Sequence, residues 1–208
     1  MKRHLALSLL LWLAAVLPAV RAAVVYSGVE DIAIPQNFAG VYLNISTGAT
    51  APSEPGTWST APWLNPFFGG VGIGNSALLQ PIVTGTAQIV NLPAGTTIGA
   101  GANFVLGESG SSTHVGPAAN QFQPGVEGYI GYQFQLPGGG GADYYGWLGI
   151  QVNNAGAGTI TDWAYQNTPG AGVAAGSLLV VPEAGTALPG IALCGVYLMR
   201  RRRGAKMS

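Results

Sequence analysis

The sequence predicts an all-β fold, an antiparallel β-sandwich or jelly roll, for the middle of this 208-residue chain. Short runs of alternating apolar and polar residues recur between 23 and 180, and such alternation is typical of strands that bury one face. The 33 glycines and 14 prolines interrupt nearly every window that a helix would need. Many short strands separated by turns favour a sandwich or a jelly roll.

Three consecutive strands form the clearest pattern in the sequence. Alternating residues occupy 129–136, 144–153 and 159–165, and glycine-rich turns at 137–141 and 153–158 separate them. Strands joined by short turns of this kind predict an antiparallel meander.

The two faces of the middle strand of this meander differ, one being apolar and the other carrying Trp147, Gln151 and Asn153. Leu148, Ile150 and Val152 share one face, whereas Trp147 lies on the other. We therefore expect Trp147 to lie at the surface or against a second layer.

Shorter strands are expected in the rest of the domain. They cover 24–26, 29–34, 39–46, 78–83, 87–91 and 103–106. Two segments rich in Pro, Ser, Thr or Gly, 47–66 and 109–121, are predicted to be long surface loops.

The N-terminal 22 residues have the pattern of a secretory signal peptide. Lys2 and Arg3 precede an almost unbroken apolar run, and Val20 and Ala22 stand at −3 and −1 of a cut before Ala23. A basic start, an apolar run and small residues at the exit are the marks of an exported chain.

The C-terminal end is also apolar and then basic. Residues 184–199 carry no charge and predict a short transmembrane helix, which the cluster Arg200, Arg201, Arg202 and Arg203 follows as a stop-transfer signal. Residues 204–208 are then a short cytoplasmic tail, and the folded ectodomain is 23–180.

Charge is distributed unevenly along the chain. All eight lysines and arginines belong to the two ends, whereas 23–182 holds seven of the eight acidic residues, a formal charge of −7. Nucleic-acid binding needs basic side chains that displace phosphate counterions, so nucleic-acid partners are excluded for this domain. Anionic lipid surfaces and phosphorylated ligands are disfavoured for the same reason.

The candidate catalytic and cofactor motifs are weak. Residues 72–77 fit G-x-G-x-x-A, but Pro81 would end the helix that a dinucleotide site requires, so a glycine-rich turn is expected there. His114 is predicted to lie in a loop, without the ligands that zinc needs and without a nucleophile elbow around Ser109 or Ser112. We expect no catalytic residues, no metal-binding motif and no cofactor. A structural calcium ion held by scattered acidic residues is the alternative that stays open.

Tryptophans offer a second alternative to a purely structural domain. Trp58, Trp63 and Trp147 can form an exposed platform that stacks on sugar rings, or they can fill the core. The first case predicts a secreted carbohydrate-binding module that contacts extracellular polysaccharide. If two acidic residues also lay on either side of a bound sugar, the domain could be a glycan-active enzyme, since glycoside cleavage uses a pair of carboxyl groups.

The C-terminal elements, taken in order, resemble the PEP-CTERM sorting signal over 181–203. Val181, Pro182 and Glu183 stand where that family has its Pro-Glu-Pro-like motif, with Ala184 in place of the second proline, and the apolar segment and the arginines follow. Residues 144–170 also look like the segment common just before that signal.

The resemblance implies a route and a location for the chain. Its implied partners are signal peptidase and an exosortase-type membrane protease. The chain would be anchored transiently in the inner membrane and then reach the outer surface or extracellular matrix of a Gram-negative bacterium. The sequence thus predicts an exported, non-enzymatic structural protein of the cell surface or matrix.

Overall fold

The computed structural model describes residues 23–85, 87–105, 109–113 and 115–178, and of 109–112 the backbone only. The expected signal peptide (1–22), the sorting signal (181–203) with its helix (184–199), and the tail (204–208) lie outside these residues. Within them, no helix is long and apolar enough to cross a membrane.

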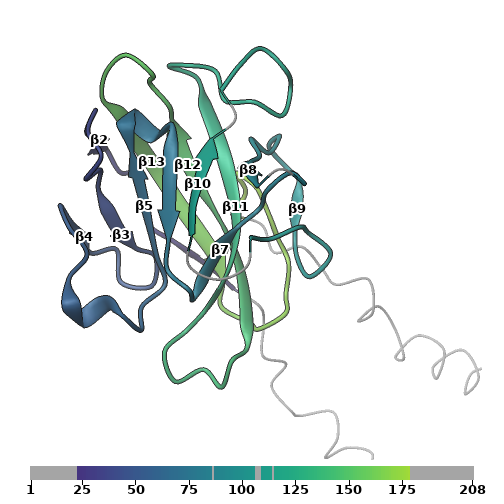
Figure 1. Cartoon of the computed structure of the whole chain (residues 1–208). Helices are drawn as coiled ribbons and strands as arrows, with labels where there is room; N and C mark the ends of the chain where they lie inside the picture. Colours follow the sequence, from purple (N-terminus) through teal and green to yellow (C-terminus); the bar gives the residue numbers. More distant parts are fainter. Residues whose placement is uncertain (1–22, 86, 106–108, 114, 179–208) are drawn as a thin grey trace, which may run out of the picture.

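The described chain is almost entirely β-structure, in two six-stranded sheets and one two-stranded sheet (Figure 1). The first sheet comprises β1 (Val24–Tyr26), β2 (Ile32–Ile34), β7 (Leu79–Pro81), β11 (Glu127–Gln135), β12 (Asp143–Gln151) and β13 (Gly158–Gln166). The second comprises β3 (Tyr42–Asn44), β4 (Thr50–Ala51), β5 (Trp63–Phe67), β6 (Gly72–Asn75), β8 (Gln88–Ile89) and β10 (Ser109–Thr113). The third pairs β9 (Thr97–Ile98) with β14 (Val173–Ala174). The short 3-10 turns η2 (Gly56–Trp58) and η3 (Phe68–Gly70) complete the described elements.

The expected meander is confirmed as the centre of the first sheet. β11, β12 and β13 are nine residues each and pair antiparallel, with Leu148 of β12 opposite both Ile130 and Trp163. β1 and β2 then pair with the two ends of β13, and β7 pairs with β11. All described strand pairs are antiparallel except β8 with β10.

The two large sheets face each other across one hydrophobic cluster, which we call the inner core. Fully buried members come from both sheets, for example Leu43 and Leu64 from the second and Ile130 and Leu148 from the first. The alternation predicted for 39–46 is confirmed only in part: Val41, Leu43 and Ile45 are buried as expected, but Ala39 is exposed and Asn44 is buried. The strand itself is limited to β3. Each buried apolar side chain contributes roughly 1.5–3 kcal/mol by leaving water.

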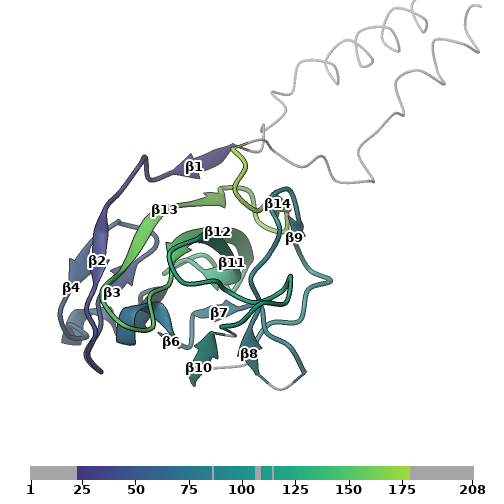
Figure 2. The ribbon, with the colours of Figure 1, turned by 90° about the horizontal axis from the view of Figure 1, so that it is seen from above.

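A second cluster, the outer core, covers the opposite face of the first sheet. Trp147, Tyr145 and Ala164 contribute from the sheet, and β9, β14 and the segment around Leu92 pack over them. The view from above in Figure 2 shows β9 and β14 beside β11 and β12. Trp147 therefore faces a second layer, which was one of the two positions expected for it.

One buried polar side chain in this region has no hydrogen-bond partner within the described part of the chain. Gln166 of β13 is fully buried, and neither its amide nitrogen nor its amide oxygen makes a hydrogen bond with any residue that the structure describes. Leaving such groups unpaired costs about 1–3 kcal/mol.

Two segments predicted as surface loops contain strands of the second sheet. The loop expected at 47–66 ends in β5, where Trp63, Leu64, Asn65 and Pro66 are all buried, and the loop expected at 109–121 begins with β10. The sequence does not predict β5 as a strand because it contains one asparagine and one proline, and both residue types are rare inside strands. Asn65 is nevertheless satisfied, since its side-chain nitrogen donates to the carbonyl of Ala39 at 2.9 Å.

Three smaller predictions also need correction. The glycine-rich turn expected at 72–77 is largely strand β6, which pairs with β5 and β10. The strand expected at 103–106 is reduced to one isolated bridge between Phe104 and Ile82. The strand expected at 29–34 shortens to β2.

Candidate functional site

The tryptophans predicted as a glycan platform do not form one surface. Trp63 is 5 % exposed and Trp147 is 1 % exposed, so the expectation of an exposed stacking face is wrong for both. Their indole N–H groups already make hydrogen bonds within the protein: Trp63 donates to Glu54 and Trp147 donates to the carbonyl of Ser177, each at 3.2 Å. Trp58 lies half-buried in η2. Trp63 and Trp147 are instead buried in the core, which was the alternative expected for them.

The remaining predicted site residues lie outside the described part of the chain. These are Val181, Pro182, Glu183, the arginines at 200–203, and His114. Within the described ranges, no three His, Cys, Asp or Glu residues lie close enough together to hold a metal ion.

The structure brings together two acidic residues that are 35 positions apart, Glu127 of β11 and Asp162 of β13. The Thr161 hydroxyl lies 2.7 Å from Glu127 Oε1 and 3.1 Å from Asp162 Oδ1, so both carboxylates share one donor. A bulge in β13 causes this, because Gly149 pairs with Asp162 while the next residue, Ile150, pairs with Ile160. Thr161 is the extra residue.

Gly149 leaves room for this cluster. A Cβ atom at 149 would lie 2.2 Å from Asp162 Oδ1 and 2.5 Å from Thr161 Oγ1, so any larger residue would displace both groups. From β1, the Tyr26 hydroxyl donates to Asp162 Oδ2 at 3.1 Å.

The electrostatics of Asp162 follow from partial burial. Desolvation raises the pKa of Asp162, and the nearby charge of Glu127 acts in the same direction, whereas the hydrogen bonds from Tyr26 and Thr161 lower it. The net pKa is raised, so the folded protein favours the protonated carboxyl. The ionised form therefore makes folding less favourable.

We predict that Asp162→Asn is more stable than the natural protein at pH 7, by less than about 1 kcal/mol, the size of exposed charge interactions. A raised folded-state pKa means that stability is lost as pH rises from the ordinary value of 3.8 through the higher folded value. The asparagine cannot ionise, so the variant does not lose this stability as the pH rises. Urea unfolding between pH 3 and pH 8 measures the difference, which should vanish below the ordinary value.

Glu127→Gln is the companion variant, since it removes the neighbouring charge and leaves Asp162 in place. We expect a smaller gain with the same pH dependence. A lower stability of Asp162→Asn at pH 7 would mean that the two hydrogen bonds to the carboxylate outweigh its desolvation.

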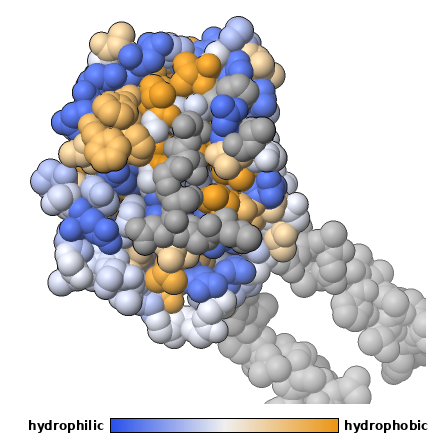
Figure 3. All heavy atoms as spheres, in the orientation of Figure 1, coloured by the Kyte–Doolittle hydropathy of each residue, from blue (hydrophilic) through white to orange (hydrophobic). Residues whose placement is uncertain are grey.

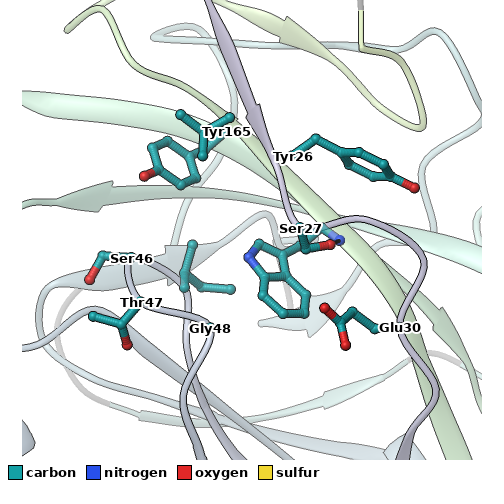
Figure 4. A pocket seen from close by; sticks show the side chains of 10 residues that line it. Tyr26, Ser27, Glu30, Ser46, Thr47, Gly48 and Tyr165 are labelled. Atoms are coloured by element: carbon teal, nitrogen blue, oxygen red, sulfur yellow. Dashed lines mark hydrogen bonds between the residues drawn. The ribbon is translucent and has the colours of Figure 1, made fainter.

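A pocket of about 330 Å³ opens where the edge of the first sheet meets the turn between β3 and β4 (Figure 4). We call it the edge pocket. Its lining consists of Val25, Tyr26, Ser27, Glu30, Ile45, Ser46, Thr47, Gly48, Trp163 and Tyr165. In Figure 4, Ser46 and Thr47 stand on one side, Ser27 and Glu30 on the other, and the Tyr26 ring points away.

Local hydrogen bonds fix both walls of the edge pocket. On one side, Ser27 Oγ accepts from the backbone N–H of Trp163 at 3.0 Å and donates to the carbonyl of Gly28 at 2.7 Å. On the other, Asn44 Oδ1 accepts from both the backbone N–H and the hydroxyl of Ser46, at 3.0 and 2.8 Å. The pocket is therefore bounded by ordered backbone on both sides.

Trp163 forms the apolar part of the edge pocket with Val25 and Ile45. The residue is 5 % exposed, and its Nε1 is not among the buried side-chain atoms that lack a hydrogen-bond partner in the described ranges. Gly48, at φ 73°, brings the turn close to this ring, because a Cβ there would meet Cζ2 at 3.4 Å. Sequence reasoning missed the pocket, since its residues come from three segments that no local pattern links.

Comparison with known proteins identifies no relative. No family model, no curated protein and no solved structure matches this chain. Any functional assignment therefore depends on the residues of the chain itself.

Proposed function

We propose that this chain is an exported structural protein of the cell surface or extracellular matrix, with a β-sandwich ectodomain and no catalytic role. Its C-terminal PEP-CTERM-like signal would hold it in the inner membrane until an exosortase-type protease releases it. The observation that carries the proposal is the separation of charge: every lysine and arginine lies in an end segment, and 23–182 has none. A cluster of positive residues beside a short apolar segment is typical of a signal that places and orients a chain in a membrane.

The arrangement of the sheets supports a β-sandwich. Two six-stranded sheets contribute to one inner core, and side chains from facing strands meet there. The core of this domain stabilises it without help from a disulfide within 23–182, since the only cysteine of the sequence, Cys194, lies in the C-terminal apolar segment.

The positions of the first and last described residues also support the proposal. Trp147 lies between them, with its ring 6.4 Å from that of Tyr26 and its N–H on the carbonyl of Ser177. Figure 2 shows the start of β1 and the chain after β14 meeting at one corner. The first and last described residues therefore lie close together, which suits a domain attached to a membrane at one corner.

The N-terminal junction suits removal of a signal peptide. Ala23, the residue after the expected cut, is exposed, and its nitrogen donates to Asn167 Oδ1 at 2.9 Å. A free amine at Ala23 would keep this contact. Signal peptidase is therefore one proposed partner, and the exosortase-type protease acting near Val181, Pro182 and Glu183 is the other.

Exposed aromatic residues lie at the far end of the domain from this corner. Phe38 is 76 % exposed and its ring lies 5.5 Å from Phe67 and 6.0 Å from Phe68. They neighbour the β2–β3 and β5–β6 connections, whereas the termini lie at the opposite end of β13. Figure 3 shows one face of the domain, on which hydrophobic residues lie among hydrophilic ones in the upper part.

Replacing all four arginines at 200–203 by glutamine tests the sorting proposal. We expect the surface-attached protein to be lost and the chain to appear in the periplasm or unprocessed in the membrane, because the stop-transfer charge is gone. Immunoblots of cell fractions measure this, and Lys206→Gln is the matched control that should keep the natural distribution. Unchanged surface attachment of the four-arginine variant would contradict the proposed role of the tail.

A further inference from the structure

We propose that the edge pocket binds a neutral, hydroxyl-rich ligand, and that a single sugar ring is the chemical class it accepts. This inference goes beyond the proposed surface role and does not depend on how the chain is exported. It rests on Trp163 and not on Trp58, Trp63 or Trp147.

The indole N–H of Trp163 offers a donor to a ligand with an acceptor oxygen. The corresponding nitrogens of Trp63 and Trp147 donate hydrogen bonds within the protein. Trp163 is 5 % exposed and lines the pocket, and its Nε1 is accessible to solvent, since the buried polar side-chain atoms without a partner in the described part of the chain belong to Gln166. A hydroxyl or ring oxygen of a ligand would satisfy this donor.

The rest of the lining offers the mixed donors and acceptors that hydroxyl groups need. Thr47 and Tyr165 supply hydroxyls, and Glu30 supplies a carboxylate that accepts. Burial raises the pKa of Tyr165, with Tyr144 adding to the effect, so its phenol stays protonated and able to donate. Val25 and Ile45 supply the apolar contact for C–H groups of a ring.

Charge argues for a neutral ligand. Glu30 is the only charged residue in the lining, and 23–182 contains no lysine or arginine that would attract an anion. A quaternary ammonium ion is disfavoured because it has no acceptor for the Trp163 N–H, and because the Trp163 face is packed in the inner core.

Size restricts the ligand to one ring. A volume of about 330 Å³ lies at the lower end of the roughly 300–1,000 Å³ typical of small-molecule sites. Ligands with about a dozen heavy atoms bind with dissociation constants on the order of 1 mM.

The test is a titration of the full-length chain, purified in detergent, by saturation-transfer NMR. The probes are glucose, galactose, mannose and N-acetylglucosamine, with glucuronate, inorganic phosphate and choline for comparison. We expect at least one neutral sugar to bind with a dissociation constant on the order of 1 mM, and tighter than all three charged probes.

Two variants locate the binding. Thr47→Trp places a ring at the exposed mouth of the pocket without entering a core, and it should abolish binding. Trp163→Phe keeps an aromatic ring in the inner core but removes the N–H, and it should weaken binding about 3- to 10-fold. Thr60→Trp, at an exposed position outside the pocket, is the control and should bind as the natural protein does.

Three outcomes would overturn the inference. They are no neutral sugar binding below about 20 mM, a charged probe binding more tightly than every neutral sugar, and binding that survives Thr47→Trp. The last result keeps the inference testable even if Trp163→Phe were poorly folded.

Discussion

Gly69→Ala is expected to lose about 2–5 kcal/mol of folding free energy, from a left-handed backbone that disfavours alanine and from overpacking. Gly69 of η3 has φ 65°. A Cβ there would lie 2.0 Å from the carbonyl oxygen of Asn153 and 2.4 Å from that of Gly156. Both are backbone atoms, so the turn at 153–158 would have to move. Urea unfolding followed by tryptophan fluorescence measures the loss.

Gly125→Ala is the matched control for this prediction. Gly125 has φ 75°, but no atom lies within 4 Å of its Cβ position. We expect it to lose only the backbone part, about 1–2 kcal/mol. Equal losses at 69 and 125 would show that η3 does not hold the turn at 153–158 in the way described.

Trp147→Ala is expected to lose about 3–5 kcal/mol, the cost of removing a large aromatic side chain from a core. Trp147 is 1 % exposed, packs edge-on against Tyr129 at 5.5 Å, and donates to Ser177. Its removal would open a cavity under β9 and β14 and release the last described residues. The midpoint of thermal unfolding should fall accordingly.

Trp58→Ala tests whether this loss comes from burial. Trp58 is half-buried in a turn and makes no core contact in either cluster, so we expect a loss below about 1 kcal/mol. If the two alanine variants were equally stable, the outer core would not exist as a packed layer.

The centre of the fold could be predicted from the sequence because its strands are long and regular. Nine-residue strands alternate clearly, so Ile130 and Leu148 identify the buried face without reference to distant residues. Short strands carry too few residues for this, and β5 also contains Asn65 and Pro66, which imitate a loop. Its strand character comes from pairing with β3 and β6, which is tertiary information.

The second layer and the edge pocket could not be predicted for the same reason. Alternation shows that Trp147 lies opposite Leu148, but it does not show that β9 and β14 cover it. The pocket joins the segment after β1, the turn after β3 and the middle of β13. Only the paired strands bring Ser27, Thr47 and Trp163 together.

The intact mass of the protein attached to the cell surface shows whether both ends of the chain are removed. We expect a mature chain that begins at Ala23 and has lost the apolar segment 184–199 together with the arginines after it. Full-length chain recovered from the cytoplasm, with residues 1–22 and 184–203 still present, would contradict this expectation.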